Sequence, residues 1–431
     1  MSDPTSVGYK PSKSHTILGF LMVLNVLNMV DRNLLSSFGP QVVEDLQLTD
    51  SEFGLLTGLI FVFFYAVMGL FMGVLTDRVH RPRLIAAGLL LWSVLTAYSG
   101  IAKNFFQIAM ARLFIGAGES SLTPGSVSML SDLYPQNKRG MALGIYYLGI
   151  PLGAGGSFIV AGILGPILGW RNCFLLLGAL GVLLAIPLFF MRDPKRGGLD
   201  QPADTAPADN QAALKKNSFS DVMRSLRANP ALMLTIAGAV FLHIPVGAGQ
   251  FAMLWLVRER GFDAAEIATV YGGLFIIFGT IGTLFGGIAS DWFQARFNGG
   301  RIRFLAYLML VITPFTIGYR FAESDSIIFY MGMSAGFLFM SSFYGPAFST
   351  AQDLSPVAMR GTVAGLLLVA CNLVGIGCGA VLTGFVSEFM QASGSEQPLT
   401  WALITADICS VLTIPCFVWA SMYISKKGVT A

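Results

Sequence analysis

The chain has 431 residues, of which 54% are hydrophobic and 12% are charged, and its mean hydropathy is +0.68. This composition excludes an ordinary soluble globular domain, because such domains carry about 25% charged residues. The formal net charge of +3 gives no reason to expect a nucleic-acid partner. The composition therefore indicates an integral membrane protein.

Runs of apolar residues recur along the whole chain, each long enough to cross a hydrocarbon core of about 30 Å. The polar segment Met1–Ser14 leads directly into the first run, so we expect no cleavable signal peptide. The pattern predicts an all-α integral membrane protein with twelve transmembrane helices, at residues 16–38, 52–75, 83–102, 105–130, 139–165, 171–191, 230–257, 265–289, 303–321, 325–349, 360–389 and 399–424.

The basic residues are distributed unevenly between alternate loops. With both termini on the inner side, the inner segments hold 20 of the 27 Lys and Arg residues and the outer loops hold five. The remaining two, Arg32 and Arg112, lie within predicted spans. This asymmetry follows the positive-inside rule. We therefore expect both termini to be cytoplasmic, in a protein of the plasma (inner) membrane.

Two of the predicted spans carry full charges. Asp31 and Arg32 are adjacent in the first span, and Arg112 and Glu119 lie in the fourth. Seven residues return to nearly the same helix face, about 10 Å further along the axis. Because one charge near the bilayer centre costs about 2.5–3.5 kcal/mol, four of them in two spans indicate a functional site.

The four charged residues suit a proton switch. Burial favours the protonated form of a carboxyl group, whereas a neighbouring arginine favours the carboxylate. We predict that Asp31 and Glu119 carry the coupling proton, with Glu119 as a second proton site or as the partner of Arg112. Arg32 and Arg112 would bind an anionic head group or relay charge. The alternative is a static charge network that holds the two spans together.

The inner loops contain a repeated pattern. The segment Gly73-Val-Leu-Thr-Asp77-Arg78 is echoed 214 residues later at Gly287-Ile-Ala-Ser-Asp291, and Asp132-Leu133 is echoed 221 residues later at Asp353-Leu354. In each loop a glycine would permit close helix approach, and an aspartate would accept from an arginine or a helix N-terminus. The expected cytoplasmic gate comprises Gly73, Asp77, Arg78, Arg81, Asp132, Arg139, Asp291, Asp353 and Arg360.

The two similar offsets, each with its motif in the corresponding loop, predict two pseudo-symmetric six-helix halves. Between them lies a segment rich in Pro, Asp, Ala, Gln and Lys, which is typical of a linker. We therefore divide the chain into a cytoplasmic tail (1–15), a first six-helix bundle (16–192), a cytoplasmic linker (193–228), a second bundle (229–424) and a C-terminal tail (425–431).

Twelve spans, the two-half repeat and the G-x-x-x-D-R-x-x-R-x-R loop resemble the major facilitator superfamily over essentially the whole chain. In the first half, Asn28-Met-Val-Asp31-Arg32, Arg112-x6-Glu119 and Tyr147-Leu-Gly-Ile-Pro-Leu-Gly153 resemble the Spinster family, whose members are similar to exporters of lysophospholipids and sphingosine phosphate. Met29 and Ser120 depart from that family's pattern. Organic anion:cation symporters also carry an Asp-Arg pair and an Arg/Glu helix, so the substrate class stays open.

The resemblance implies a central cavity lined by the first, fourth, seventh and tenth spans, so the four charged residues would share it. The seventh and tenth spans are instead rich in aromatic residues and Met. A charged half opposite an apolar half suits an amphipathic substrate, although contact with lipid would explain the same composition. The expected apolar cavity residues are Phe241, His243, Phe251, Trp255, Met333, Phe337 and Tyr344.

The leading prediction is a proton-coupled secondary active transporter that works by alternating access and exports or flips lysolipid-like or hydrophobic drug-like substrates. The alternative is a proton-coupled symporter of small organic anions. We expect no enzyme activity, because the sequence contains no nucleophile–histidine pair, metal-ligand cluster or phosphate loop. The expected partners are the amphipathic or anionic substrate and membrane lipids. Protons are the only expected coupling species, with no cofactor, no metal and a monomeric state.

Overall fold

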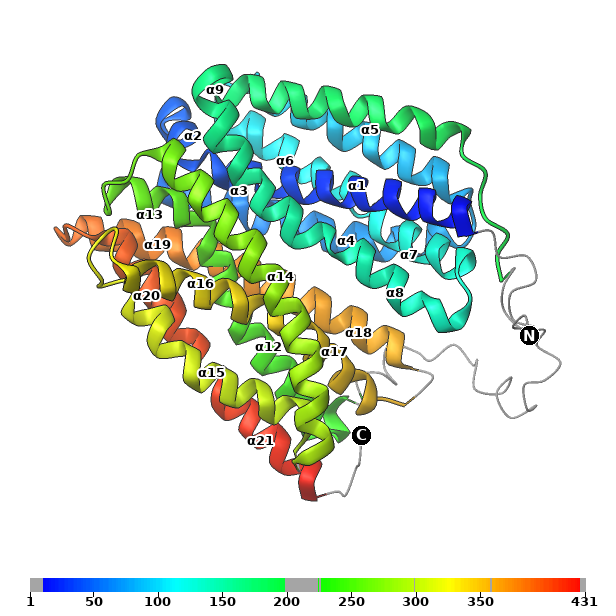
Figure 1. Ribbon diagram of the computed structural model, residues 1–431. Helices are drawn as coiled ribbons and strands as arrows, with labels where there is room; N and C mark the ends of the chain where they lie inside the picture. The colour runs from blue at the N-terminus through cyan, green and yellow to red at the C-terminus, as the bar shows by residue number, and fades with distance from the viewer. Residues whose placement is uncertain (1–10, 198–223, 225, 298, 357–358, 427–431) are drawn as a thin grey trace. The chain divides into compact units, whose positions relative to one another are not determined.

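A computed structural model describes residues 11–197, 224, 226–297, 299–356 and 359–426, and all regular structure in these residues is helical (Figure 1). The first sequence half contains α1 (Pro11–Ser37), α2 (Gly39–Leu46), α3 (Asp50–Thr57), α4 (Leu59–Thr76), α5 (Arg81–Ser99), α6 (Phe105–Glu119), α7 (Leu122–Leu133), α8 (Gln136–Tyr147) and α9 (Gly149–Phe190). The second contains α12 (Pro230–Ala248), η3 (Gly249–Phe251), α13 (Ala252–Arg258), α14 (Ala264–Arg296), α15 (Gly300–Gly318), α16 (Ile327–Ser342), α17 (Tyr344–Asp353), α18 (Arg360–Val369), η5 (Ala370–Gly377), α19 (Cys378–Ala392), α20 (Pro398–Val411) and α21 (Thr413–Lys426).

Within the described residues, 10 helical stretches are long and apolar enough to cross a membrane. One of them, Gln136–Phe190, contains both the fifth and the sixth predicted spans, because Gly169 (φ 74°, ψ 159°) breaks the helix and turns the chain back. The fourth predicted span is divided between α6 and α7. The predicted all-α membrane fold is confirmed, and the helices are consistent with twelve spans.

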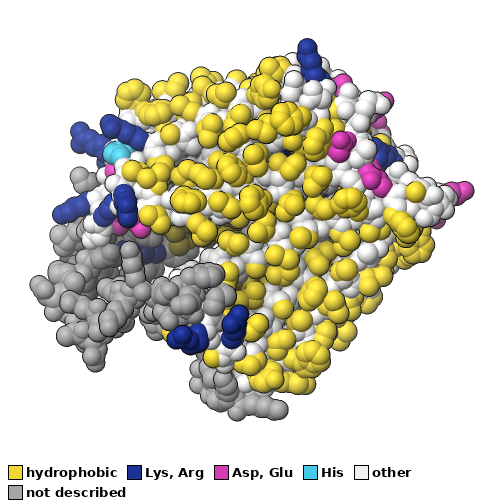
Figure 2. All heavy atoms as spheres, turned by 180° about the vertical axis from the view of Figure 1, so that it is seen from behind, with side chains coloured by type: hydrophobic (Ala, Val, Ile, Leu, Met, Phe, Trp, Pro, Cys, Tyr) yellow, Lys and Arg dark blue, Asp and Glu magenta, His cyan; other side chains and the backbone are white. Residues whose placement is uncertain are grey.

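Large apolar side chains point outward from many helices. Leu70, Ile167, Phe190 and Ile288 are each more than half exposed. Figure 2 shows hydrophobic side chains covering the visible helix surfaces, with Lys and Arg side chains gathered near helix ends. Such a surface would associate in water, whereas lipid tails satisfy it, because the helices bond their own backbone groups internally.

The helices form two compact units, each of which includes a segment from the other sequence half. The first unit contains the described residues of Met1–Leu48, Ile60–Thr205 and Asp263–Ile276, and the second contains those of Thr49–Leu59, Ala206–Phe262 and Ile277–Ala431. The division into sequence halves at a linker stays a prediction, since residues 198–223 lie outside the described chain.

Glycines on α9 bring helices of the first unit into close contact. A Cβ on Gly155 would lie 2.5 Å from the carbonyl oxygen of Gly272 in α14, and one on Gly153 would collide with α1 at Val26 and Met29. Small residues allow this approach in membranes, where packing rather than hydrophobicity drives helix association. The contact with α9 supports α1 on one side and leaves its charged residues directed to other helices.

Candidate functional site

Asp31 and Arg32 of α1 contact different helices, because successive helix residues are about 100° apart. The Asp31 side chain is buried, and its Oδ2 accepts a 2.6 Å hydrogen bond from the Thr96 hydroxyl of α5. Arg32 donates through Nη2 and Nε to Oε2 of Glu119 at the end of α6, at 3.0 and 3.2 Å. Two polar contacts thus join α1 to its neighbours within the membrane.

Glu119 lies where the fourth span is interrupted. It is the last residue of α6, it is 1% exposed, and the chain makes a turn at Ser120 and Ser121 before α7 begins. Ser120 and Ser121 keep right-handed helical backbone angles, so α7 continues almost directly from α6. The guanidinium of Arg32 supplies the positive charge that compensates the buried carboxylate of Glu119.

Two glycines hold the charged end of α6 close to its neighbours. A Cβ on Gly116 would lie 2.7 Å from the Phe61 carbonyl oxygen of α4, and one on Gly118 would lie 2.8 Å from the Gly88 carbonyl oxygen of α5. Both distances are too short for a real side chain. The absence of a side chain at these two positions therefore places Glu119 against α4 and α5.

Aromatic rings of α4 surround the two arginines. The guanidinium carbon of Arg112 lies 4.7 Å from the ring centroid of Phe61, and that of Arg32 lies 5.2 Å from Phe61 and 4.4 Å from Tyr65. The negative faces of these rings attract both cations. Arg112 also donates through Nη2 to the Arg32 carbonyl oxygen, at 3.3 Å.

The predicted pairing of Arg112 with Glu119 is not found. Among the described residues no salt bridge joins Arg112 to a carboxylate, and Glu119 pairs with Arg32 instead. Arg112 Nε and Glu119 Oε1 are buried without hydrogen-bond partners. These two atoms therefore have hydrogen-bonding capacity that no protein group of the described residues uses.

In the second unit, His243 and Tyr344 lie together. The Nδ1 of His243 donates to the Ala239 carbonyl, at 2.8 Å, so its Nε2 accepts from the Tyr344 hydroxyl, at 3.3 Å. This contact joins α12 to α17, so His243 is bonded to a neighbouring helix.

The other predicted apolar residues are dispersed. Phe251 packs edge-on against Phe53, whereas Trp255 packs against Tyr319 and Phe329 and donates to Thr400, at 2.7 Å. These contacts account for the burial of Phe251 and Trp255 without a ligand. Met333 and Phe337 are buried and Phe241 is half-buried. The cavity role of all seven residues stays a prediction.

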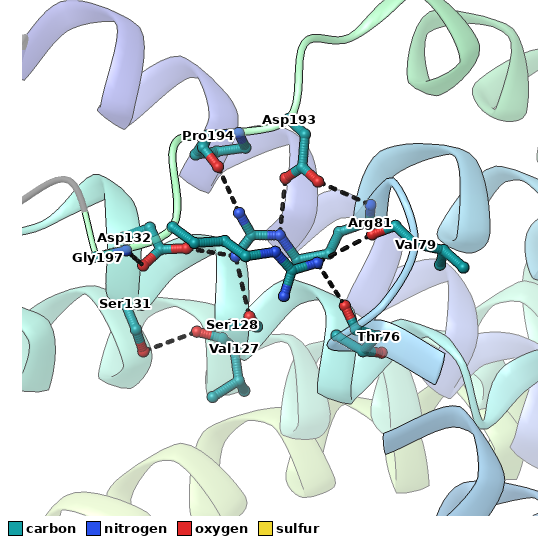
Figure 3. Close-up of polar contacts among 11 residues, drawn as sticks. Thr76, Val79, Arg81, Val127, Ser128, Ser131, Asp132, Asp193, Pro194 and Gly197 are labelled. Carbon is teal, nitrogen blue, oxygen red and sulfur yellow. Dashed lines mark hydrogen bonds and ion pairs between the residues drawn. The ribbon is translucent and has the colours of Figure 1, made fainter. Parts of the chain in front are cut away.

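The gate residues of the first unit centre on Arg81, whose side chain is fully buried (Figure 3). Its guanidinium bonds to Asp132 and Ser128 of α7, and to Asp193 and the Pro194 carbonyl just beyond α9, with 2.7 Å between Nε and Asp193 Oδ1. One arginine therefore ties the start of α5 to α7 and to the segment that follows α9.

A corresponding cluster occurs in the second unit. Arg301 of α15 donates to Asp291, at 2.8 Å, and to Asp353, at 2.9 Å. Asp132 and Asp353 are the aspartates related by the 221-residue repeat, and each accepts from an arginine near the start of a helix. The repeated loop motif thus has a repeated ion-pair arrangement.

Other predicted gate residues are placed differently. Asp77 and Arg78 are exposed, and Arg139 and Arg360 donate to the backbone carbonyls of Tyr134 and Gln352. The close helix approach predicted at Gly73 is wrong for this structure, because a Cβ there would meet nothing within 4 Å. The ion-pair arrangement that the two clusters share depends instead on the long side chains of Arg81 and Arg301.

Sequence reasoning missed several residues of these sites. Phe61 and Tyr65 carry the signal of an aromatic pair four residues apart, which places both on one helix face. Thr96 and Asp193 carry no distinguishing signal. Asp407, which had no assigned role, pairs with Arg320 at 3.2 Å, so a solitary acid within an apolar span has its partner at the end of another span.

The sequence pattern of the Major Facilitator Superfamily matches residues 21–380. The chain belongs to this superfamily. It is 27% identical to an MFS-type efflux pump of Mycolicibacterium smegmatis, over 91% of this chain and 89% of the relative. It is 25% identical to the sphingosine-1-phosphate transporter SPNS2 of Xenopus tropicalis, over 90% of this chain and 76% of the relative.

Solved structures agree with this assignment. A bacterial homologue of the human lysosomal transporter Spinster, in an inward-facing and unoccupied conformation, matches with a TM-score of 0.86 and 24% identity over 97% of this chain and 99% of that chain. The nucleoside transporter NupG matches with a TM-score of 0.71 at 12% identity, covering 94% of this chain and 99% of that chain. The predicted Spinster-like facilitator identity is confirmed: the protein is a multi-pass membrane transporter of a small molecule.

Removing the Arg81 side chain should destabilise this facilitator, because it leaves Asp132 and Asp193 without a cation. We expect Arg81→Gln to lower the unfolding free energy by about 2–4 kcal/mol, since breaking a fully buried pair costs about 3–5 kcal/mol and these carboxylates are partly exposed. Thermal unfolding in detergent measures the effect. The matched control is Arg83→Gln at an exposed arginine two residues away, and equal melting temperatures for the two variants would contradict the role of Arg81.

A methyl group at Gly118 should force α6 away from α5. We expect Gly118→Ala to cost about 1–3 kcal/mol, the usual range for overpacking. Gly73→Ala adds the same methyl group into open space and should leave the melting temperature unchanged or slightly raised. Thermal unfolding of both variants side by side tests the difference, and an unaffected Gly118→Ala variant would rule out the close contact.

Proposed function

We propose that this facilitator is a proton-coupled secondary active transporter, that it works by alternating access, and that it carries anionic amphiphiles of the lysolipid type. The observation that carries the proposal is the buried arrangement in which Thr96 bonds to Asp31 while Arg32 bonds to Glu119. It contains two carboxyl groups and two cations within one unit, and only one carboxyl group has a directly bonded cation. The two carboxyl groups can therefore differ in their affinity for a proton.

In the proposed cycle, Asp31 carries the proton while its direct partner is a neutral hydroxyl. The charged groups near it are Glu119 of α6, Arg112 of α6 and Arg32 of its own helix. A movement that brings Arg112 onto Asp31 favours the carboxylate and releases the proton. Arg112 has the capacity for such a bond, because its Nε is unused.

The substrate head group would engage Arg32. Its side chain is 23% exposed, whereas Asp31, Arg112 and Glu119 are nearly completely buried, so Arg32 is the charged group of the cluster that a substrate can reach. A phosphate or carboxylate that pairs with Arg32 competes with Glu119, which then favours protonation of Glu119. Substrate binding and proton uptake are coupled in this way.

The amphiphilic character of the substrate is inferred from the relatives and from the chain itself. Two relatives carry the names of a sphingosine-1-phosphate transporter and an efflux pump. The second-unit residues expected near the substrate are largely aromatic residues and Met. A small organic anion remains the second candidate, because Arg32 would serve its carboxylate equally well.

The proposal of alternating access is supported by the hydrogen bonds of Asp50, which lies at the start of α3. In the second unit, buried Asp50 accepts from Arg258 Nη1 at 2.9 Å, Ser387 Oγ at 2.6 Å and Gln391 Nε2 at 3.0 Å. Asp50 belongs to the first sequence half and its partners to the second. Bonds of this kind hold the halves together at one membrane face, and alternating access requires them to break and re-form.

The basic residues support a topology with both termini in the cytoplasm and the Asp50 contacts on the outer side. We propose the plasma membrane as the location and a monomer as the working form. Protons are the proposed coupling species.

Transport in proteoliposomes under an imposed pH gradient tests the proton switch. A fluorescent lysophospholipid should move in the wild type, and Asp31→Asn should abolish the dependence of its rate on the gradient, because an amide cannot carry the proton. Glu119→Gln should weaken or abolish coupled transport and also lose the ion pair with Arg32.

Small carboxylates are compared in the same vesicles. Movement of carboxylates with an inert lysophospholipid would replace the amphiphile with the organic anion as substrate. Full pH dependence in Asp31→Asn would exclude Asp31 as the proton carrier. Thr96→Val is a useful companion, because it removes only the hydroxyl partner and should change the pH at which coupling is lost.

A disulfide across the Asp50 contacts tests alternating access. In a background without native cysteines, oxidation of the Asp50→Cys, Ser387→Cys double variant should stop transport, because the two side chains lie in hydrogen-bonding contact. Reduction should restore the rate. Each single variant, oxidised in the same way, is the control, and unchanged transport by the fully cross-linked protein would contradict alternating access at this face.

A further inference from the structure

A groove on the surface of the second unit lies between the start of α12 and the end of α21. Its volume is about 540 Å³, and it is lined by Arg227, Pro230, Met233, Leu234, Trp419, Met422 and Tyr423. This volume lies within the range of about 300–1,000 Å³ that is typical of sites for small molecules. None of these residues belongs to the charged cluster or to either gate.

The groove has a simple origin in helix packing. Further along the helices, α12 and α21 are in close contact, since Gly238 leaves room for the Phe417 ring and Thr413 donates to the Gly238 carbonyl, at 3.1 Å. One to two turns beyond this contact, the groove is bordered by the first turn of α12 and the last two turns of α21.

The lining combines one cation with an apolar wall. Arg227 is exposed and makes no hydrogen bond or ion pair with the described residues, although it lies within the groove. Trp419, Met422 and Tyr423 share one face of α21 and are 55%, 48% and 44% exposed. On α12, Met233 is 49% exposed. Large apolar groups this open are satisfied by lipid rather than by water.

The pattern matches the cross-section of a membrane interface. Trp and Tyr prefer the level of the lipid head groups, and both lie near the end of α21. Arg227 lies three residues before the start of α12, whereas Met233 and Leu234 lie about one turn inside this apolar helix. A guanidinium binds phosphate through paired hydrogen bonds, and basic groups between transmembrane helices bind anionic head groups.

We propose that this groove is a binding site for one anionic phospholipid of the leaflet that borders the start of α12. Its phosphate pairs with Arg227, and its acyl chains lie along Met233, Leu234 and Met422, with the rings of Trp419 and Tyr423 at the head group. The site is separate from the transported substrate, and it does not depend on the proposed function. In the proposed topology the leaflet is the cytoplasmic one.

Quenching of tryptophan fluorescence tests the site on the full-length protein in detergent. Phosphatidylglycerol and phosphatidylcholine with brominated acyl chains are titrated separately, and the Trp419→Phe variant identifies the Trp419 contribution. We expect phosphatidylglycerol to quench Trp419 at lower concentration. Arg227→Gln should reduce this preference about fivefold, which corresponds to about 1 kcal/mol for one basic residue near an anionic lipid surface.

Three further variants and one soluble competitor test whether the preference is specific to this groove. Arg227→Lys should keep most of the preference, and Arg224→Gln should keep all of it, because Arg224 is an exposed arginine outside the groove. Met233→Phe should narrow the groove without adding a tryptophan, and it should weaken quenching of Trp419 while the charge is intact. Glycerol phosphate, which lacks acyl chains, should not compete. Equal quenching by both lipids, or an unchanged preference in Arg227→Gln, would overturn the proposal.

Discussion

The ion pair between Arg32 and Glu119 is the interaction on which the interior of the first unit depends. Neither charge could remain alone in the membrane, because a single charge near the bilayer centre costs about 2.5–3.5 kcal/mol. The surrounding features follow from this constraint. Glycines at 116 and 118 bring the end of α6 close to α4 and α5, and two rings of α4 lie against the arginines. The junction of α6 and α7 is thus the place where a buried carboxylate meets the arginine of α1.

Paired charges also organise the two clusters at the helix ends that were predicted as gates. In each unit an arginine near the start of a helix binds the aspartate related by the repeat, Arg81 with Asp132 and Arg301 with Asp353. Their burial differs: the Arg81 side chain is fully buried and that of Arg301 is 20% exposed. Arg81 also binds the segment after α9. The first cluster is therefore a structural tie that includes the start of the linker, and the second is more open to rearrangement.

Much of the fold could be predicted from the sequence because length and hydropathy determine which segments cross a bilayer. The charged residues of the site were also visible, since a charge within an apolar run is conspicuous. The residues that these charged side chains contact could not be predicted from the sequence. Asp31 and Arg32 are adjacent, and only the packing of α5 and α6 decides that one meets Thr96 and the other Glu119. The aromatic partners Phe61 and Tyr65 are ordinary residues of an apolar span, so their role depends on the glycines of a different helix.

The second predicted span connects the contacts of Asp50 to the contacts of Phe61 with the two arginines. Gly58 interrupts it with φ −107° and ψ −102°, so that α3 and α4 are separate helices in different units. Asp50 at the start of α3 binds Arg258, and Phe61 near the start of α4 faces Arg32 and Arg112. The two residues are 11 positions apart, about 16 Å along a helix. Because glycine breaks are where membrane helices bend, release of Asp50 would act on the rings beside the arginines through a single short stretch of chain. In the proposed transport cycle, this covalent connection would link proton binding to the opening of one membrane face, without a long path through packed side chains.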